Sequence, residues 1–249
     1  MPSKRTLAIE TSGEYVKNRE VSMRFSIIMP VLNEEAVLEQ QLVYLSNQCT
    51  NVESEIIVVD GGSTDATVAI AQRYARVITS PRGRARQMNA GAAIASGDVL
   101  LFLHADTRLP DGAFHAIENA FCSPAVIAGA FRLCFNCDSL PYRLVALATN
   151  LRSQWYTSFT GDQAYFVRTD SFRAIGGYPN LPLMEDLEII TALRKIGKVV
   201  LLPQYVTTSA RRHERIGLWK SVCFMWYLRI LYRFGVPAAR LQQFYVDVR

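Results

Sequence analysis

The sequence of 249 residues lacks the glycine patterns of two common nucleotide-binding sites. It contains no G-x-G-x-x-G, in which a strand–helix turn approaches a dinucleotide, and no G-x-x-x-x-G-K-[ST], the phosphate-binding loop of many NTPases. These absences disfavour a dinucleotide-dependent dehydrogenase and a P-loop enzyme.

Cysteine and histidine are also scarce, with five cysteines and three histidines in the chain. Cys134 and Cys137 form a C-x-x-C, but no second C-x-x-C or histidine pair completes a zinc-binding set. An odd, scattered set of cysteines favours reduced thiols in a cytoplasmic protein.

Long apolar runs are missing as well. No stretch reaches the 18 or more apolar residues of a membrane-spanning helix. The first 22 residues are polar and have no apolar core of a signal peptide, so we expect residues 1–22 to be a disordered extension, or Met23 to be the start of translation.

The positive charge is confined to one end of the chain. The net charge is +5, yet residues 209–249 alone carry +6, from eight Lys/Arg against Glu214 and Asp247. The preceding 208 residues therefore sum to −1, which argues against a nucleic-acid-binding protein.

What is present is an alternation of short apolar runs and helical patterns. Apolar strands are predicted at Phe25–Met29, stopping at Pro30, at Ile56–Val59, at "RVITS" and at "DVLLFLHAD", each followed by a helix. In the second half we expect strands in "AVIAGAFRLCFN" and at Ala164–Val167, and helices in "SLPYRLVALATNLRSQWY" and at Glu185–Ile196. The pattern predicts an α/β fold with a mostly parallel, doubly wound central sheet flanked by helices.

Polar residues follow three of the predicted strands. They are Asn33 and Glu34, then Asp60, then His104 and Asp106. Ligands bind at the carboxyl ends of the strands in such sheets, so we expect these groups to meet there.

The motifs "PVLNEE", "VVDGGSTDAT", "GRARQMNAGAAIASGD", "FLHADT" and "PLMEDLE", in this order, resemble the family 2 glycosyltransferases. These are inverting enzymes of the Rossmann-like GT-A fold. The resemblance implies a catalytic domain at 23–215, with a nucleotide-binding half at 23–110 and an acceptor half at 111–215. A helical tail at 216–249 would follow.

The resemblance implies a nucleotide-diphospho-sugar donor, by default a UDP-sugar, and a divalent cation, Mn²⁺ or Mg²⁺, held by Asp106. His104 stands in the place of the first acidic residue of the family's D-x-D, so a hydrogen bond to ribose or phosphate competes with a metal role. Asp60 resembles the residue that holds the base, and Gly61 replaces the second Asp of many relatives. The further donor-binding residues it implies are Pro30, Val31, Asn33, Glu34, Arg82, Arg86 and Asn89, with Arg84 beside them.

Asp186 corresponds to the family's catalytic base, with Glu185 beside it. Acidic residues also suit a helix N-terminus, and both roles are compatible. His213 is a further candidate metal or phosphate ligand, with an ordinary surface position as the alternative. Gly161, Asp162 and Gln163 are expected on the acceptor side, whereas His115 is expected to be structural.

The tail from Gly217 to Tyr245 is the most apolar and aromatic part of the chain. Either it packs as a core helix or it lies in a membrane interface. An interface would suit the four aromatic residues Trp219, Trp226, Tyr227 and Tyr232, and anionic headgroups would suit the nearby arginines. The second alternative favours a lipid-linked acceptor and a peripheral location on the inner face of the cell membrane. The resemblance to bacterial members of the family implies a carotenoid-like or other lipid acceptor.

Two other functions compete with the transferase. A nucleotidyltransferase would need a glycine-rich basic motif after the first strand, which "PVLNEE" does not supply. A catalytically degenerate nucleotide-sugar-binding protein is compatible with the departures at Gly61 and His104.

Overall fold

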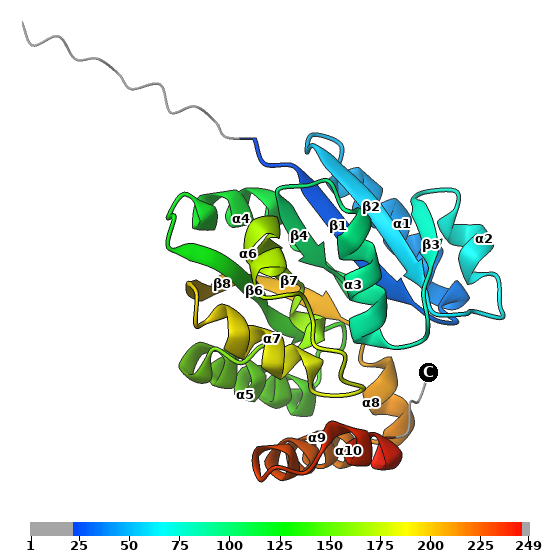
Figure 1. Ribbon diagram of the computed structural model, residues 1–249. Helices are drawn as coiled ribbons and strands as arrows, with labels where there is room; N and C mark the ends of the chain where they lie inside the picture. Colours follow the sequence, from blue (N-terminus) through cyan, green and yellow to red (C-terminus); the bar gives the residue numbers. More distant parts are fainter. Residues whose placement is uncertain (1–21, 246–249) are drawn as a thin grey trace, which may run out of the picture.

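A computed structural model describes residues 22–245. The prediction for residues 1–22 therefore falls outside the described residues, apart from Ser22. The chain forms one eight-stranded sheet covered by helices on both faces (Figure 1). The strands are β1 (Phe25–Val31), β2 (Ser54–Asp60), β3 (Arg76–Thr79), β4 (Val99–Phe102), β5 (Thr107–Arg108), β6 (Val126–Phe135), β7 (Tyr165–Arg168) and β8 (Lys198–Thr208). The helices are α1 (Glu35–Gln48), α2 (Thr67–Ala71), α3 (Arg84–Ile94), α4 (Ala113–Phe121), α5 (Leu140–Tyr156), α6 (Thr169–Ala174), α7 (Glu185–Leu193), α8 (Arg211–Ile216), α9 (Leu218–Arg233) and α10 (Ala238–Phe244), with a 3₁₀ turn at Gly161–Gln163.

The strand order is β3-β2-β1-β4-β7-β6-β8-β5. The first four strands in this order pair in parallel, as the alternation of strands and helices predicts. The strand β7 runs antiparallel to both β4 and β6, and β5 runs antiparallel to β8. The mostly parallel sheet is confirmed, and its antiparallel pairs involve β7 and β5.

Pro30 does not end the first strand, so that prediction is wrong. The strand continues to Val31, and Pro30 pairs with Val59 of β2. The ladder with β4 has already stopped, because its last pair is Ile28 with Phe102. Leu103 donates to the carbonyl of Ile28, so the alternation along β1 turns Pro30 toward this vacated side, where the missing N–H costs no sheet hydrogen bond.

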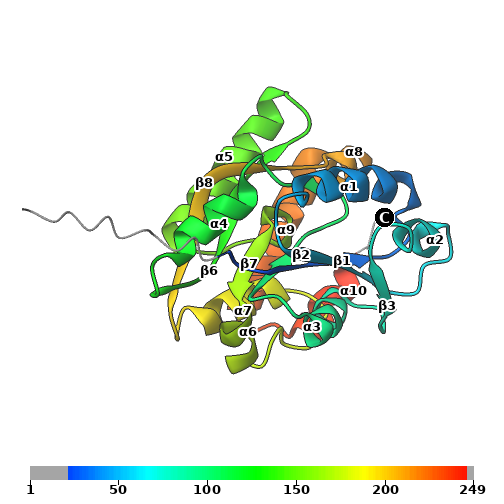
Figure 2. The same cartoon turned by 90° about the horizontal axis from the view of Figure 1, so that it is seen from above.

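The sheet separates two apolar layers (Figure 2). One layer joins the sheet to Leu38, Leu42 and Leu45 of α1 and to Phe114 and Ile117 of α4. The other layer joins it to residues of α3, α6 and α7. Strands buried on both faces explain the almost continuous apolar runs of β1 and β4.

A tight junction holds the start of β4 against β1. A Cβ atom added at Gly97 would lie 2.7 Å from both the carbonyl oxygen of Arg24 and the amide nitrogen of Ser26. The Gly97 amide donates to Ser26 Oγ at 2.9 Å, and that hydroxyl donates to Glu55 Oε1 at 2.7 Å. Glycine is required here because backbone atoms occupy the space of a side chain.

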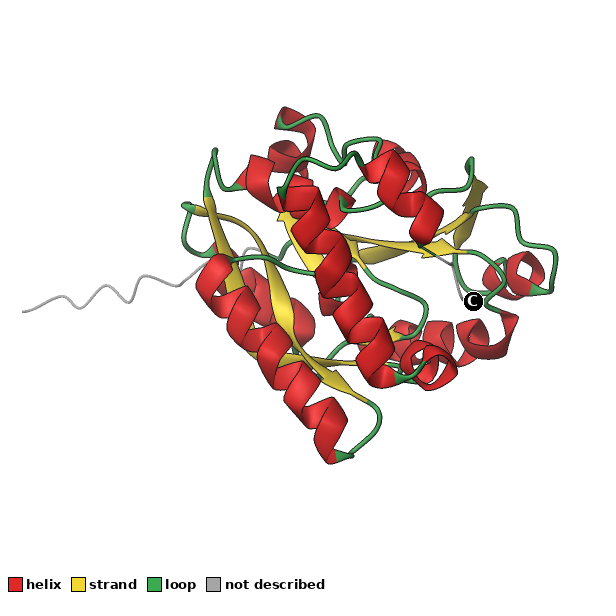
Figure 3. Cartoon of the chain, turned by 90° about the horizontal axis from the view of Figure 1, so that it is seen from below, coloured by secondary structure: helices red, strands yellow, loops and turns green. Residues whose placement is uncertain are grey.

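The tail forms α9 and α10, which pack beside the chain that leads into α7. Leu228 and Leu241 are buried there against Leu183 and Met184. Figure 3, from below, shows α9 beside the long helix α5. Within residues 22–245, no helix is both long and apolar enough to span a bilayer.

Candidate active site

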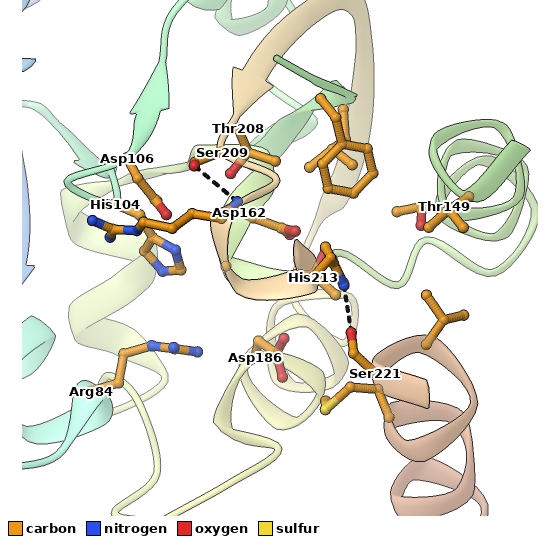
Figure 4. A pocket seen from close by; sticks show the side chains of 18 of the residues that line it. Arg84, His104, Asp106, Thr149, Asp162, Asp186, Thr208, Ser209, His213 and Ser221 are labelled. Carbon is orange, nitrogen blue, oxygen red and sulfur yellow. Dashed lines mark hydrogen bonds between the residues drawn. The ribbon is translucent and has the colours of Figure 1, made fainter. Parts of the chain in front are cut away.

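A pocket of about 270 Å³ lies at the carboxyl ends of β1 and β4. Residues from α5, α7, α8 and α9 complete its wall, so both halves of the chain build it. Its acidic lining residues are Glu34, Asp106, Asp162, Glu185 and Asp186, and its arginines are Arg84, Arg152, Arg211, Arg215 and Arg229. In Figure 4 the carboxylates of Asp106, Asp162 and Asp186 share one space, with Arg84 and His104 on one side and Thr149 on the other.

Glu34 and Arg211 connect the two ends of the chain at this pocket. Glu34 follows β1, and Arg211 begins α8. The Arg211 guanidinium donates to Glu34 Oε2 at 2.8 Å. Both side chains are at least two-thirds buried, so this charge-assisted hydrogen bond is sheltered from solvent.

Asp106 lies in the turn between β4 and β5. The Thr107 amide donates to the His104 carbonyl at 3.1 Å, and the Ser209 amide donates to the Asp106 carbonyl at 3.2 Å. Burial is the main cause that raises the pKa of the Asp106 carboxyl, and the neighbouring charge of Glu34 raises it further. The site concentrates oxygen ligands and negative charge, which suits Mg²⁺ or Mn²⁺.

The protein alone does not surround such an ion. Within residues 22–245, no three His, Cys, Asp or Glu side chains lie close enough together to hold a metal. The predicted metal ligands Asp106 and His213 both line the pocket but do not form a complete ligand set. A cation bound at Asp106 needs further oxygens from a ligand.

His104 packs directly against the backbone of the 3₁₀ turn at Gly161–Gln163. A Cβ atom added at Gly161 would lie 2.8 Å from His104 Nε2 and 2.9 Å from Cε1. Glycine at this position therefore lets the imidazole of His104 enter the pocket wall. The sequence places these residues 57 apart, and the fold brings them into contact.

Glu185 and Asp186 begin α7 and differ in their surroundings. Met184 precedes them in the left-handed conformation, which turns the chain sharply into the helix. Glu185 is buried, and its Oε1 lies 3.8 Å from Nη1 of Arg84. Burial raises the pKa of Glu185, Arg84 opposes this shift, and Asp186 adds to it.

Asp186 serves the helix and also lines the pocket. Its Oδ1 accepts a hydrogen bond at 3.0 Å from the Leu187 amide, in the first turn of α7. Both interpretations of this carboxylate, a contact at the helix start and a group facing the pocket, are therefore compatible with its position.

His213 lies on α8 and is fixed by its neighbours. Its Nδ1 shares a hydrogen bond with Ser221 Oγ of α9 (Figure 4). Its ring meets those of Phe135 and Tyr142 edge-on, with centroids 5.3 and 6.3 Å apart. The residue lines the pocket, and its role as a metal ligand stays a prediction.

Several predicted donor residues lie in a loop network beside the pocket. Asp60 accepts from the Gly62 amide at 2.9 Å and from the Ser63 amide and hydroxyl. Ser63 Oγ in turn accepts from the Asn33 amide, and Asn33 Oδ1 accepts from the Thr64 amide, both at 2.9 Å. These side chains hold the loops after β1 and β2 together.

Some of the remaining predicted site residues line the pocket and others lie outside it. Pro30, Gly161 and Asp162 line the pocket, whereas Val31, Asn33 and Asp60 do not. Gln163 is fully buried and holds the 3₁₀ turn in place through Phe131, Ser153 and Thr160.

Two donor-binding candidates are engaged with the loop before α7. Asn89 exchanges hydrogen bonds with the backbone of Tyr178, and Arg86 donates to Asn180. Arg82 is exposed, and of the three neighbouring arginines only Arg84 lines the pocket.

Sequence reasoning missed four pocket arginines, Arg152, Arg211, Arg215 and Arg229. Each lies on a helix in a sequence context that is ordinary for surface charge. The net charge of the tail was the only signal that included three of them. Their convergence depends on how α5, α8 and α9 pack.

Comparison with known proteins gives a consistent set of relatives. The family described as "Glycosyl transferase family 2" matches residues 26–177. A PGL/p-HBAD biosynthesis glycosyltransferase of Mycobacterium tuberculosis (strain ATCC 25177 / H37Ra) is 43% identical over 93 residues, 34% of this chain and 36% of that protein. The Probable glycosyltransferase YdaM of Bacillus subtilis (strain 168) is 25% identical over 227 residues, 82% of this chain and 54% of that protein. The chain thus spans about a third to a half of the length of these relatives.

Solved structures share the fold. The mannosyltransferase PcManGT from Pyrobaculum calidifontis, in complex with GDP-Man and Mn²⁺, has a TM-score of 0.58 at 21% identity, covering 76% of this chain and 57% of that one. The glucosyl-3-phosphoglycerate synthase from Mycobacterium tuberculosis, in complex with Mn²⁺, UDP and glucosyl-3-phosphoglycerate, has a TM-score of 0.52 at 20% identity, covering 75% and 70%.

Proposed function

The chain belongs to glycosyl transferase family 2, and on this premise we propose that it transfers a sugar from a nucleoside-diphosphate donor, by default a UDP-sugar, to an acceptor hydroxyl with inversion. The observation that carries this proposal is the pocket at the carboxyl edge of the sheet. It holds Asp106, which follows β4, and Asp186, at the start of α7, in one space.

On the donor side, Asp106 would hold Mn²⁺ or Mg²⁺ together with the donor's phosphate oxygens. When bound, the ion would neutralise the charge that develops on the leaving diphosphate. Arg84 and Arg211 line the same space and would pair with phosphate oxygens, while His104 would contact phosphate or ribose. The Asp60–Ser63–Asn33 network would shape the surface for the base and ribose.

On the acceptor side, Asp186 would take the proton of the attacking hydroxyl. Inversion is a single in-line displacement, so one carboxylate opposite the leaving group is sufficient. Glu185 would act as a positioning residue, since it is buried against Arg84. Asp162 would contact the acceptor's other hydroxyl groups.

The acceptor side is bordered by two exposed apolar stripes on neighbouring helices. The stripe on α5 consists of Leu140, Leu144, Leu147, Leu151 and Trp155. The stripe on α9 and its end consists of Trp219, Cys223, Trp226, Ile230 and Phe234. Both follow the spacing i, i+4, i+7, i+11, i+15, which places each set on one helical face.

These stripes support a peripheral contact with an anionic membrane and a lipid-linked acceptor. Tryptophan suits the headgroup layer, and the exposed cations Lys220 and Arg233 lie on the same helix as the second stripe. Leu147→Glu and Ile230→Glu are expected to lower sedimentation with phosphatidylserine-containing vesicles. Ile196→Glu, at an equally exposed site on another face, is the matched control. Equal binding of all variants would contradict the membrane contact.

The experiment that tests the transferase proposal is a thermal-shift panel of nucleoside diphosphates with and without Mn²⁺. One base should raise the midpoint of unfolding by mass action, and the rise should require the ion. Asp106→Ala should remove the ion-dependent part. An unchanged ion-dependent shift in that variant would contradict the proposed site.

A further inference from the structure

Two arginines of the acceptor side differ from the other charged groups of the pocket. Arg152 belongs to α5 and Arg229 to α9, and both line the cavity between these neighbouring helices. They are close enough for the positive charge of each to act on the other. The role proposed above for Asp106, Asp186 and the donor phosphates uses neither of them.

Both side chains lack hydrogen-bond partners among the described residues. The buried Nε and Nη2 of Arg152 and the buried Nε of Arg229 find no acceptor there. By contrast, Arg211 is bonded to Glu34 and Arg84 faces Glu185. A buried guanidinium without an acceptor is unfavourable, so an acceptor from outside the chain would relieve the cost.

The backbone around Arg152 is held rigidly. Asn150 exchanges two hydrogen bonds with the backbone of Leu133, at 2.8 and 2.9 Å. Ser153 Oγ lies 3.0 Å from Gln163 Oε1, to which it donates. On α9, the residue before Arg229 is the fully buried Leu228, whose apolar packing fixes the helix there. The two guanidiniums are therefore presented from fixed supports, which lowers the entropy cost of binding a ligand.

The charges that line the cavity are separated into a positive end, at Arg152 and Arg229, and nearby carboxylates, Asp162 and Asp186. Burial is the main cause that lowers the pKa of Arg152, to about 10, and repulsion by Arg229 adds to this, while Asp162 and Asp186 oppose it. An anion between the two arginines would remove their repulsion. The carboxylates would keep that anion at the arginine end and leave a neutral hydroxyl group for Asp186.

We propose that Arg152 and Arg229 form an oxyanion site for the acceptor, separate from the donor's diphosphate. This inference rests on the proposed transferase function. A phosphate monoester fits best, because its three oxygens can accept from both guanidinium forks at once. The acceptor is then a hydroxyl compound that carries a phosphate, either as a soluble molecule or as a lipid headgroup.

The test measures binding of inorganic phosphate by calorimetry to the full chain saturated with UDP and Mn²⁺. Arg152→Gln and Arg229→Gln are each expected to weaken phosphate binding about 10- to 100-fold, because each removes charge-assisted hydrogen bonds to the phosphate. The affinity for UDP is expected to stay unchanged. Arg240→Gln removes the same charge from an exposed site on α10 and is expected to have no effect. Phosphate affinity that is unchanged in the first two variants, or equally reduced in all three, overturns the proposal.

Parallel loss of UDP and phosphate binding would also overturn it, since the arginines would then serve the donor. Failure of UDP to bind the wild type, by contrast, would contradict the transferase proposal, and phosphate binding would still be measurable without UDP. A folding control comes from Arg152→Met in phosphate-free buffer. Its midpoint of unfolding should exceed that of the wild type, because an unpaired buried charge is removed, whereas loss of a structural arginine would lower it.

Two further arms identify the source of the phosphate. One uses methyl phosphate and the other uses vesicles of phosphatidic acid in phosphatidylcholine. Arg152-dependent binding of methyl phosphate supports a soluble acceptor, and Arg152-dependent binding of the vesicles alone supports a lipid. If neither methyl phosphate nor the vesicles show binding that depends on Arg152, the proposed site is overturned.

Discussion

The loops after β1 and β2 and the wall formed by α5, α7 and α9 use polar residues in opposite ways. In the loops, the Asp60 carboxylate accepts hydrogen bonds from the Gly62 and Ser63 amides and from the Ser63 hydroxyl. In the wall and the adjoining 3₁₀ turn, Asp162 Oδ1, the Nε and Nη2 of Arg152 and the Nε of Arg229 are buried without hydrogen-bond partners among residues 22–245. Internal hydrogen bonds indicate a scaffold, and buried groups left without them indicate a surface built for a ligand.

The largest expected effect comes from removing the proposed base. Asp186→Asn should lower kcat about a hundred- to ten-thousand-fold in a donor hydrolysis or transfer assay, because the amide cannot accept the hydroxyl proton. Donor binding and the unfolding midpoint should change little. Asp170→Asn, at an exposed position in α6, is the matched control. Activity of the Asp186 variant close to wild type would assign the base elsewhere.

The scaffold side is expected to fail through stability and not through chemistry. Gly97→Ala should lower the free energy of unfolding by about 3 kcal/mol, since the new Cβ meets backbone atoms that cannot move aside. Urea unfolding measures the loss. Gly112→Ala is the comparison, because the space around Gly112 is open and only its left-handed conformation opposes the change. Equal losses at both sites would contradict the steric argument.

Gly161→Ala probes the contact between the 3₁₀ turn and the turn that follows β4. The added Cβ should push the His104 ring out of place and lower kcat/KM about tenfold, with little change in stability. In a His104→Ala background the same substitution should cost nothing further. Additive losses would mean that Gly161 acts through something other than the imidazole.

The smallest expected effect is a pH dependence of stability at Glu185. Because the pKa of Glu185 is raised in the folded state, its contribution to stability is greatest at low pH. That contribution falls as the pH rises from the ordinary range of a glutamate, about 4.3, through its raised value. The unfolding midpoint of Glu185→Gln should therefore rise relative to that of the wild type between pH 4 and pH 7. The exposed Glu53→Gln provides the baseline, and a pH-independent difference would contradict the burial argument.

The sequence was most informative where local pattern and tertiary structure agree. Apolar runs and turn residues predicted β1 to β4 with their helices, because buried parallel strands impose a continuous apolar signal. The error at Pro30 arose because a proline at the end of a ladder is tolerated. The two-residue strand β5 was missed, since its pairing with β8 joins residues a hundred positions apart.

The site was predicted unevenly for the same reason. Asp106, Glu185 and Asp186 stood in motifs, and the fold brings them to one pocket. Arg152 and Arg229 carried no local signal, because their meaning depends on the packing of α5 against α9. Asn89 was predicted to bind the donor and Gln163 to lie on the acceptor side. In the structure Asn89 donates to the Tyr178 carbonyl and Gln163 to the Phe131 carbonyl, so both join segments that are distant in the sequence.

The ion pair between Glu34 and Arg211 has a consequence for the order in which the molecule folds. Its two members are 177 positions apart. Contacts between distant segments carry a larger loop-closure cost than local ones, so the parallel strands β1 to β4 can pair before this contact forms. The pocket therefore takes its final shape only after α8 docks against the loop that follows β1.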